Sequence, residues 1–301
     1  MGTFYQDWDK EIIDYDMYTL QGLDLRGPRL TQSDYIAYLG AAQRFGRYCS
    51  HPFPALLGQQ LQLGTLNLGS GGKGPEYYYL NNPQSLDLIN AANLAVVQIM
   101  SGRSVSTSVL QSTRGGRTGI CRRTGKTTTA NAIFYELVSG QDPRGLNPDF
   151  LPQLVAETRE NYVKAMVALL EKIQVPKVLL WFSARSPDYQ EVYPTGWLYQ
   201  LNRWARTLSK GKRGLWGRQH KTHIEKLMGH FPHLVNRSMV EQLKPHCDRY
   251  VEYAGSPGIP QPLNTYAGKS LAPNIYYPSP EMHQQVYQRL LPVCQSLLPP
   301  G

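Results

Sequence analysis

Short apolar runs alternate with longer amphipathic segments along the chain, which predicts a parallel β-sheet with helices on both faces. The run Leu-Ala-Val-Val-Gln-Ile-Met at 94–100 is nearly continuous in apolar residues, as expected of a strand that is buried on both sides. Four other short segments are also expected to be strands. The five expected strands lie at 35–40, 65–69, 94–100, 178–182 and 250–253.

Apolar residues at helical spacing indicate the segments that cover the sheet. The clearest is 151–173, where Tyr162, Met166 and Leu169 recur on one helical face. The closing helix is expected to begin after Ser279, because serine is a good N-cap and Pro280 suits the first helical position. The expected helices lie at 53–63, 85–93, 151–173, 220–227, 238–243 and 280–291.

Two long segments, 103–149 and 184–217, interrupt this repeating pattern. The first is rich in Ser, Thr, Gly and Arg and is far longer than the ~2–6 residues usual between a strand and a helix. The second carries aromatic residues among basic ones. Each follows the carboxyl end of a predicted strand, the edge at which open α/β sheets bind ligands. We therefore expect both insertions to overhang one crevice.

Positive charge is concentrated in the same two parts of the chain. The formal net charge is +9, yet residues 88–135 and 192–224 contain no Asp or Glu. This confinement favours an anionic partner over a uniformly basic surface. Nucleic acid is a less favoured partner, through the basic and aromatic segment 197–221.

Several other classes of protein are not expected. No apolar run reaches the ~18–20 residues of a membrane span, and the acidic, aromatic start of the chain is unlike a secretory signal. The four cysteines are widely spaced and never form CxxC, which predicts reduced thiols and a cytoplasmic location. The oligomeric state is left open.

No cofactor or metal is expected either. The run Gly119–Thr127 resembles a phosphate-binding loop, but Ile120 stands where that motif requires glycine, so we expect an Arg-rich loop instead. His220, His223, His230 and His233 have a spacing that could bind a metal, but no carboxylate or cysteine completes a familiar set.

Four motifs carry a resemblance to a known family. Gly40-Ala41-Ala42 ends the first strand, and Asn67-Leu-Gly-Ser-Gly-Gly follows the second. Ser101-Gly-Arg-Ser follows the third strand, and Tyr277-Pro-Ser-Pro-Glu-Met-His begins the last helix. Together they resemble the frame of the SGNH (GDSL-type) hydrolase superfamily, in a bacterial branch that lacks the usual nucleophilic serine. The resemblance implies a flavodoxin-like three-layer sandwich, with a five-stranded parallel sheet in the order 2-1-3-4-5. It would form a single domain over 1–301, with 1–34 as an N-terminal extension.

The resemblance also implies a site. Gly72 matches the family's oxyanion glycine and His283 its catalytic base, while Ser104 stands near the position of an asparagine donor. Ala42 occupies the place of the nucleophile, and Pro280 the place of the aspartate that orients the histidine. A hydroxyl nucleophile needs both partners, so the triad is altered.

The attacking group in such a site stays open. It would be an activated water, a substrate hydroxyl, or a serine such as Ser70 or Ser104. Arg103 and Arg185 follow the third and fourth strands and would clamp an anionic group. The other expected substrate-binding residues are Gly40, Ala42, Asn67, Gly69 and Ser70.

These features predict an SGNH-like enzyme, or a relative of one, that acts on a negatively charged ester or glycan. It would be a hydrolase, or a transferase of acyl or sulfuryl groups. The alternative is a non-catalytic protein that binds an anion, a glycan or a nucleotide.

Overall fold

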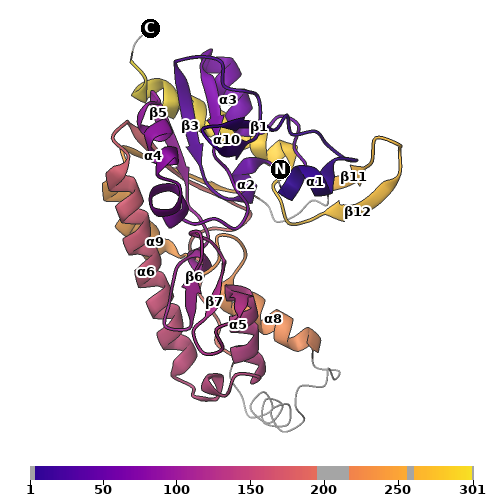
Figure 1. Cartoon of the computed structure of the whole chain (residues 1–301), viewed down its shortest axis with the longest axis vertical. Coiled ribbons are helices and arrows are strands. Elements are labelled where there is room, and N and C mark those ends of the chain that lie inside the picture. The colour runs from indigo at the N-terminus through magenta and orange to yellow at the C-terminus, as the bar shows by residue number, and fades with distance from the viewer. Residues whose placement is uncertain (1–3, 195–216, 256–260, 300–301) are drawn as a thin grey trace.

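A five-stranded parallel sheet forms the centre of the computed structural model, which describes residues 4–194, 217–255 and 261–299 (Figure 1). Its strands are, in spatial order, β4 (Gly64–Asn67), β3 (Tyr35–Leu39), β5 (Leu94–Gln98), β9 (Lys177–Ser183) and β10 (Arg249–Ala254). All neighbours are parallel. In chain order this is 2-1-3-4-5, so the predicted α/β fold and strand order are confirmed.

Helices cover both faces of the sheet, because alternate strand residues point to opposite sides. Ile36 and Tyr38 face the layer of α3 (Phe53–Leu61) and α10 (Pro280–Leu297). Ala37 and Leu39 face the layer of α4 (Pro83–Asn90), α6 (Phe150–Lys172) and α9 (Arg237–Leu243). The result is the expected three-layer arrangement.

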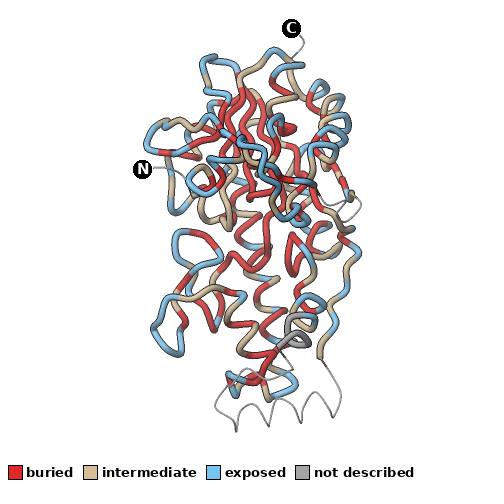
Figure 2. The backbone as a smooth tube through the Cα atoms, turned by 90° about the vertical axis from the view of Figure 1, so that its right-hand side faces the viewer, coloured by how far each residue is buried: buried red, intermediate tan, exposed pale blue. Residues whose placement is uncertain are grey.

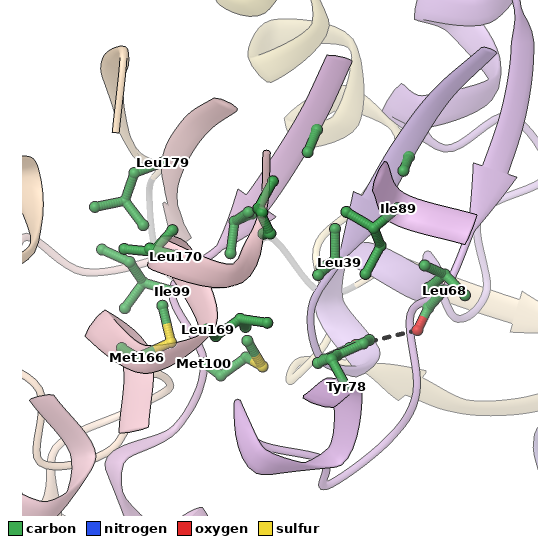
Figure 3. Close-up of a cluster of buried hydrophobic side chains, with 14 of the residues drawn as sticks. Leu39, Leu68, Tyr78, Ile89, Ile99, Met100, Met166, Leu169, Leu170 and Leu179 are labelled. Carbon is green, nitrogen blue, oxygen red and sulfur yellow. Dashed lines mark hydrogen bonds between the residues drawn. The ribbon is translucent and has the colours of Figure 1, made fainter. Parts of the chain in front are cut away.

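The second of these cores ties together the ends of two strands (Figure 3). Tyr78 lies in the short helix η1 (Tyr77–Asn81), and its buried hydroxyl donates to the carbonyls of Gly40 at 2.7 Å and Leu68 at 3.1 Å. The same oxygen accepts a hydrogen bond from the Gly40 amide at 3.0 Å. These bonds fix the backbone at the carboxyl ends of β3 and β4.

The insertion at 103–149 is a folded unit, and the basic residues Arg122, Arg123 and Lys126 of the expected Arg-rich loop lie in one of its turns. After η2 (Gly102–Ser104), three short antiparallel strands form a sheet, β6 (Leu110–Ser112), β7 (Thr118–Cys121) and β8 (Thr127–Thr129). The segment that resembled a phosphate loop is the hairpin between β7 and β8. Helix α5 (Ala130–Ser139) follows, and η3 (Pro143–Leu146) leads into α6.

A separate hydrophobic cluster holds this insertion against α8 (Gly217–Met228). Figure 2 shows in red that the lower half of the molecule has buried segments of its own. Phe134 and Leu137 of α5 pack there with Leu154 of α6 and Leu227 of α8. Residues 195–216 lie outside the described residues, as do the side chains of 217–221. The expected nucleic-acid segment 197–221 therefore falls almost wholly outside them.

Truncation of a buried side chain in this cluster should lower the free energy of unfolding as much as truncation of one in the main core. We expect Phe134→Ala, at a side chain 3% exposed, to lower the free energy of unfolding by ~3–5 kcal/mol, because a buried aromatic leaves a cavity. Urea denaturation measures the change. A loss below ~1 kcal/mol would mean that the insertion contributes little to the cooperative fold.

Smaller elements surround the carboxyl edge of the sheet. They are α1 (Phe4–Asp9), the β1 (Tyr18–Leu20) and β2 (Leu23–Leu25) pair, α2 (Ala42–Phe45), η4 (Lys244–His246) and the hairpin of β11 (Gln261–Asn264) with β12 (Ser270–Asn274). Within the described ranges, no helix combines the length and apolar character needed to cross a membrane. All four cysteines are free, and Cys247 is the one that is only half-buried.

Candidate functional site

A cleft of ≈ 1160 Å³ opens at the carboxyl ends of β3, β4 and β5. Its floor is formed by the residues that follow these strands, and the insertion forms one wall through residues 113–118. Tyr276 and Tyr277, which follow the β11–β12 hairpin, close another side. The cleft lies where an open α/β sheet is expected to bind its ligand.

Glycine at position 72 lets the insertion approach this floor closely. Gly72 has φ 73°, a left-handed conformation that favours glycine, and its carbonyl accepts a hydrogen bond from the Arg117 amide at 2.9 Å. A Cβ at this position would lie 3.1 Å from Nε of Arg117. Nearby, the Gly74 amide donates to the Gly115 carbonyl at 2.7 Å. The turn and the insertion are therefore joined by their backbones.

Cationic side chains dominate the charge of the cleft. They are Arg47, Lys73, Arg103, Arg114 and Arg117, and Asp24 supplies the single carboxylate among the described lining residues. Arg47 is paired with Asp9 at 2.7 Å. Within residues 4–194, 217–255 and 261–299, the other four form no ion pair. Their charge is available to a ligand.

Burial and neighbouring cations both act against the protonated forms of Lys73 and Arg103. Burial lowers the pKa of Lys73, and Arg114 lowers it further. Burial also lowers the pKa of Arg103, and Arg117 adds to this effect, although the Tyr276 side chain opposes it. A negative charge in the cleft would favour the protonated form of each group.

A fully buried arginine lies beneath the cleft floor. Arg44 is 0% exposed, and its three guanidinium nitrogens have no hydrogen-bond partner among the described residues. A Cβ on Gly69, which lines the cleft, would come within 3.0 Å of one of these nitrogens. Burial lowers the pKa of Arg44 to about 9, so the group is still charged at neutral pH and adds to the positive potential.

Six of the sequence-predicted residues line the cleft. Ser104 is the one with a fixed hydroxyl, which donates to the Ser101 carbonyl at 2.7 Å. The six are Ala42, Gly69, Ser70, Gly72, Arg103 and Ser104.

His283 lies apart from the residues that line the cleft. Its side chain is 0% exposed, stacked on Phe53 with centroids 5.8 Å apart and in edge contact with Phe182 at 5.1 Å. Its Nδ1 accepts a hydrogen bond from the Phe53 amide at 3.3 Å, while Nε2 has no partner among the described residues. Burial lowers the pKa of His283 to about 3, and Arg26 contributes in the same direction.

The start of α10 also has a structural explanation. Ser279 caps the helix, because its hydroxyl accepts a hydrogen bond from the Met282 amide at 3.3 Å. Pro280 occupies the first turn, where the family pattern would have an aspartate. Nothing acidic is therefore supplied to His283 from that position.

Arg185, Gly40 and Asn67 are also absent from the lining. Arg185 donates to the carbonyls of His230 at 2.9 Å and Val235 at 2.8 Å, and also to that of Pro232. It thus holds the loop between α8 and α9, and Arg103 is the half of the expected clamp that reaches the cleft. The Asn67 side chain accepts a hydrogen bond from the Gly69 amide at 3.1 Å, which shapes the turn from within.

The sequence did not single out several cleft residues. Arg47 and Lys73 follow the first two strands, and Arg114 and Arg117 belong to the acid-free stretch 88–135, so charge and position together could have indicated them. A contact between Ser101 and His233, 132 positions apart, had no local signal. In the part of the chain that the structure describes, no group of His, Cys, Asp and Glu could hold a metal ion.

Comparisons with known proteins give limited matches. A family model described as a domain of unknown function (DUF6473) matches residues 4–111. No curated protein matches the chain. The chain is similar to the solved structure of a protein from Desulfitobacterium hafniense DCB-2 that is described as a putative lipolytic protein of the G-D-S-L family. The identity is 13% and the TM-score 0.35, with 87% of this chain and 99% of the other covered. None of these matches indicates a substrate.

Proposed function

We propose that the cleft binds a negatively charged organic ligand, an anionic ester or glycan. The observation that carries this proposal is the set of four cationic side chains without an ion pair among the described residues, Lys73, Arg103, Arg114 and Arg117. They face a cleft whose lining contains one carboxylate, that of Asp24. Arg103 is buried and Lys73 half-buried, and such cations are costly without a counter-charge unless a ligand pairs with them. Arg114 and Arg117 are exposed and add to the positive potential of the cleft.

The size and lining of the cleft favour an organic ligand over a bare inorganic ion. Its ≈ 1160 Å³ exceeds the ~300–1,000 Å³ of ordinary small-molecule sites. The lining also offers the aromatic rings of Tyr5, Trp8, Tyr77, Tyr276 and Tyr277. Such rings present apolar faces with polar edges, which suit the mixed surface of a sugar.

The enzyme form of this proposal is a hydrolase or a transferase of acyl or sulfuryl groups. The alternative remains a binding protein without turnover, for an anionic glycan or a nucleotide. For His283 to act as the base, its ring would have to leave the packing of Phe53 and Phe182. The proposal therefore rests on the cations of the cleft and not on His283.

Binding of acidic and neutral sugars tests the proposal. We expect trigalacturonate and a sulfated disaccharide to bind, and the neutral maltotriose to bind far more weakly, as measured by isothermal titration calorimetry. Each charge-assisted contact contributes about 1.5–3 kcal/mol. Arg117→Gln should therefore weaken the binding of the acidic probes by roughly 10–100-fold.

Lys126→Gln is the matched control, since it removes one positive charge from the exposed end of the same insertion without touching the lining. It should leave the affinity nearly unchanged. Equal affinity for maltotriose, no binding of either acidic probe, or an equal loss in both variants would each contradict the proposal.

A further inference from the structure

A serine of the cleft lining contacts a histidine that is not part of the lining. Ser101 lies three positions after the last residue of β5, lines the cleft and is 8% exposed. Its Oγ lies 3.3 Å from Nδ1 of His233, a side chain 9% exposed in the loop between α8 and α9. Nucleophile and base in enzymes without substrate are often at this slightly long hydrogen-bond distance.

Backbone contacts hold the histidine loop against the sheet. The Gly102 amide donates to the His233 carbonyl at 2.9 Å, and a Cβ at Gly102 would lie 2.9 Å from the same oxygen. Ser183, at the end of β9, donates through its hydroxyl to the Phe231 carbonyl at 2.6 Å. Arg185 adds its bonds to the carbonyls of the same loop. The imidazole is thus positioned beside Ser101 by one residue that follows β5 and by residues at and after the end of β9.

A donor for developing negative charge lies two residues after the serine. Arg103 is 7% exposed and lines the cleft, and its Nη1 is bonded to Asn131. Its Nε is buried and has no partner among the described residues. An arginine N–H that is fixed but unbonded can stabilise an oxyanion at little reorganisation cost.

We propose that Ser101 is the nucleophile and His233 its general base, acting on a carboxylic ester of the anionic ligand. The proposal rests on the proposed function, because Lys73, Arg114 and Arg117 would bind the charge of that ligand. Arg103 Nε would donate to the oxyanion. The nucleophile would then lie in the segment after β5 and not at Ala42, the first residue of α2, where the family resemblance would place it.

The reaction balances as an ester hydrolysis. With His233 protonated on Nε2, Nδ1 accepts the Ser101 proton as Oγ bonds to the acyl carbon. The bond from that carbon to the alcohol oxygen breaks, and the alcohol takes the proton from Nδ1. Water then attacks the acyl-serine and gives its proton to Nδ1, which returns it to Oγ as the carboxylic acid leaves. No oxidant, reductant or metal is needed.

The positive surroundings of His233 allow a bound anion to raise the basicity of its imidazole. Burial holds the pKa of His233 well below its usual range, and Arg103, Arg185, His230 and Arg117 lower it further. The resting imidazole is therefore neutral and can accept a proton. A bound anion beside Arg103 and Arg117 would offset their charge and raise the basicity of the imidazole.

A matched pair of esters tests this inference. The probes are 4-nitrophenyl hemisuccinate, which is anionic, and 4-nitrophenyl acetate, which is neutral. We expect the full chain to hydrolyse the anionic ester faster, and intact-mass spectrometry to find a succinyl group on Ser101. Ser101→Ala should abolish the adduct and lower the rate at least ~10²-fold, and His233→Gln should slow formation of the adduct to a similar degree.

Ser85→Ala is the control, since it removes a buried hydroxyl that has no partner among the described residues and is not part of the cleft lining. This variant should still form the succinyl adduct on Ser101 and hydrolyse the anionic ester at the rate of the parent protein. If acidic sugars bind but no adduct forms on Ser101, the serine–histidine contact is structural and this inference is overturned while the binding function stands. If Ser101 is acylated equally by both esters and acidic sugars do not bind, the binding function fails instead.

Discussion

Arg26→Met is expected to lower the free energy of unfolding by ~3–5 kcal/mol, because several buried carbonyls would lose hydrogen bonds to a charged group that contribute about 1.5–3 kcal/mol each. The Arg26 guanidinium donates to the carbonyls of Phe45 at 2.7 Å and Gly46 at 2.6 Å, and also to that of Cys49. The side chain is 3% exposed, and burial lowers its pKa to about 10. Methionine would fill much of the volume but leave these carbonyls without their donor.

The Arg26 contacts also explain why so large an effect is expected. The guanidinium lies 4.8 Å from the ring centroid of Tyr15 and 5.3 Å from that of Phe45. Both rings belong to the cluster that supports α2. Loss of the arginine would therefore loosen the segment that follows β3, which forms part of the cleft floor.

Chemical denaturation of the two variants Arg26→Met and Arg29→Met measures this effect. Arg29 is exposed and three positions away, so its replacement should change the free energy of unfolding by less than ~0.5 kcal/mol. Arg26→Lys should fall between them, since one ammonium cannot serve the same set of carbonyls as a planar guanidinium. Equal stability of the Arg26→Met and Arg29→Met variants would show that the network contributes nothing.

The central sheet could be predicted because each of its strands is a short apolar run that is buried by helices from both sides. The apolar run at 94–100 can be recognised as a buried strand without knowing its neighbours in the sheet, and the observed strand Leu94–Gln98 lies within it. Helix ends were predicted less well: α10 continues to Leu297, past Pro292, although the helix was expected to end at 291.

The insertion could not be predicted from local pattern. Its strands have three or four residues each, and Thr127–Thr129 has no apolar side chain at all. Their pairing depends on distant contacts, such as the bridge between Lys73 and Gly116. The positive charge of the cleft could be predicted from the sequence. A stretch that contains basic residues and no acidic ones carries positive charge however the chain folds.

His283 shows that a motif can predict the position of a residue without predicting the direction of its side chain. The family resemblance placed it at the start of the last helix, and it is there, one turn after its N-cap. The direction of the ring was not encoded in that motif. It depends on Phe53 of α3 and Phe182 of β9, which enclose the imidazole.

His283 is expected to make the fold sensitive to acid. Its pKa is lowered by burial from 6.5 to about 3 in the folded protein, so below pH 6.5 the unfolded chain binds a proton that the folded chain excludes. Stability is therefore fully present above about pH 6.5 and falls as the pH drops towards 3. The contribution of this one group to the slope approaches ~1.4 kcal/mol per pH unit.

His283→Gln should remove that slope, because an amide does not titrate yet can still accept the hydrogen bond from the Phe53 amide. At pH 8 we expect the variant to be less stable than the parent by ~1–3 kcal/mol, the cost of a poorly satisfied buried amide. The difference should shrink steadily as the pH is lowered from 6.5 to 4, and urea denaturation at each pH measures it.

His51→Gln, which removes an exposed imidazole, serves as the control and should follow the parent at every pH. Burial also lowers the pKa of His233, so this residue makes its own contribution to the loss of stability at low pH. That contribution is the same in all three proteins and cancels when their stabilities are compared. Parallel curves for the parent and His283→Gln would mean that the folded protein protonates His283 freely. The ring would then have to reach solvent or an acidic partner, and a catalytic role for it would regain support.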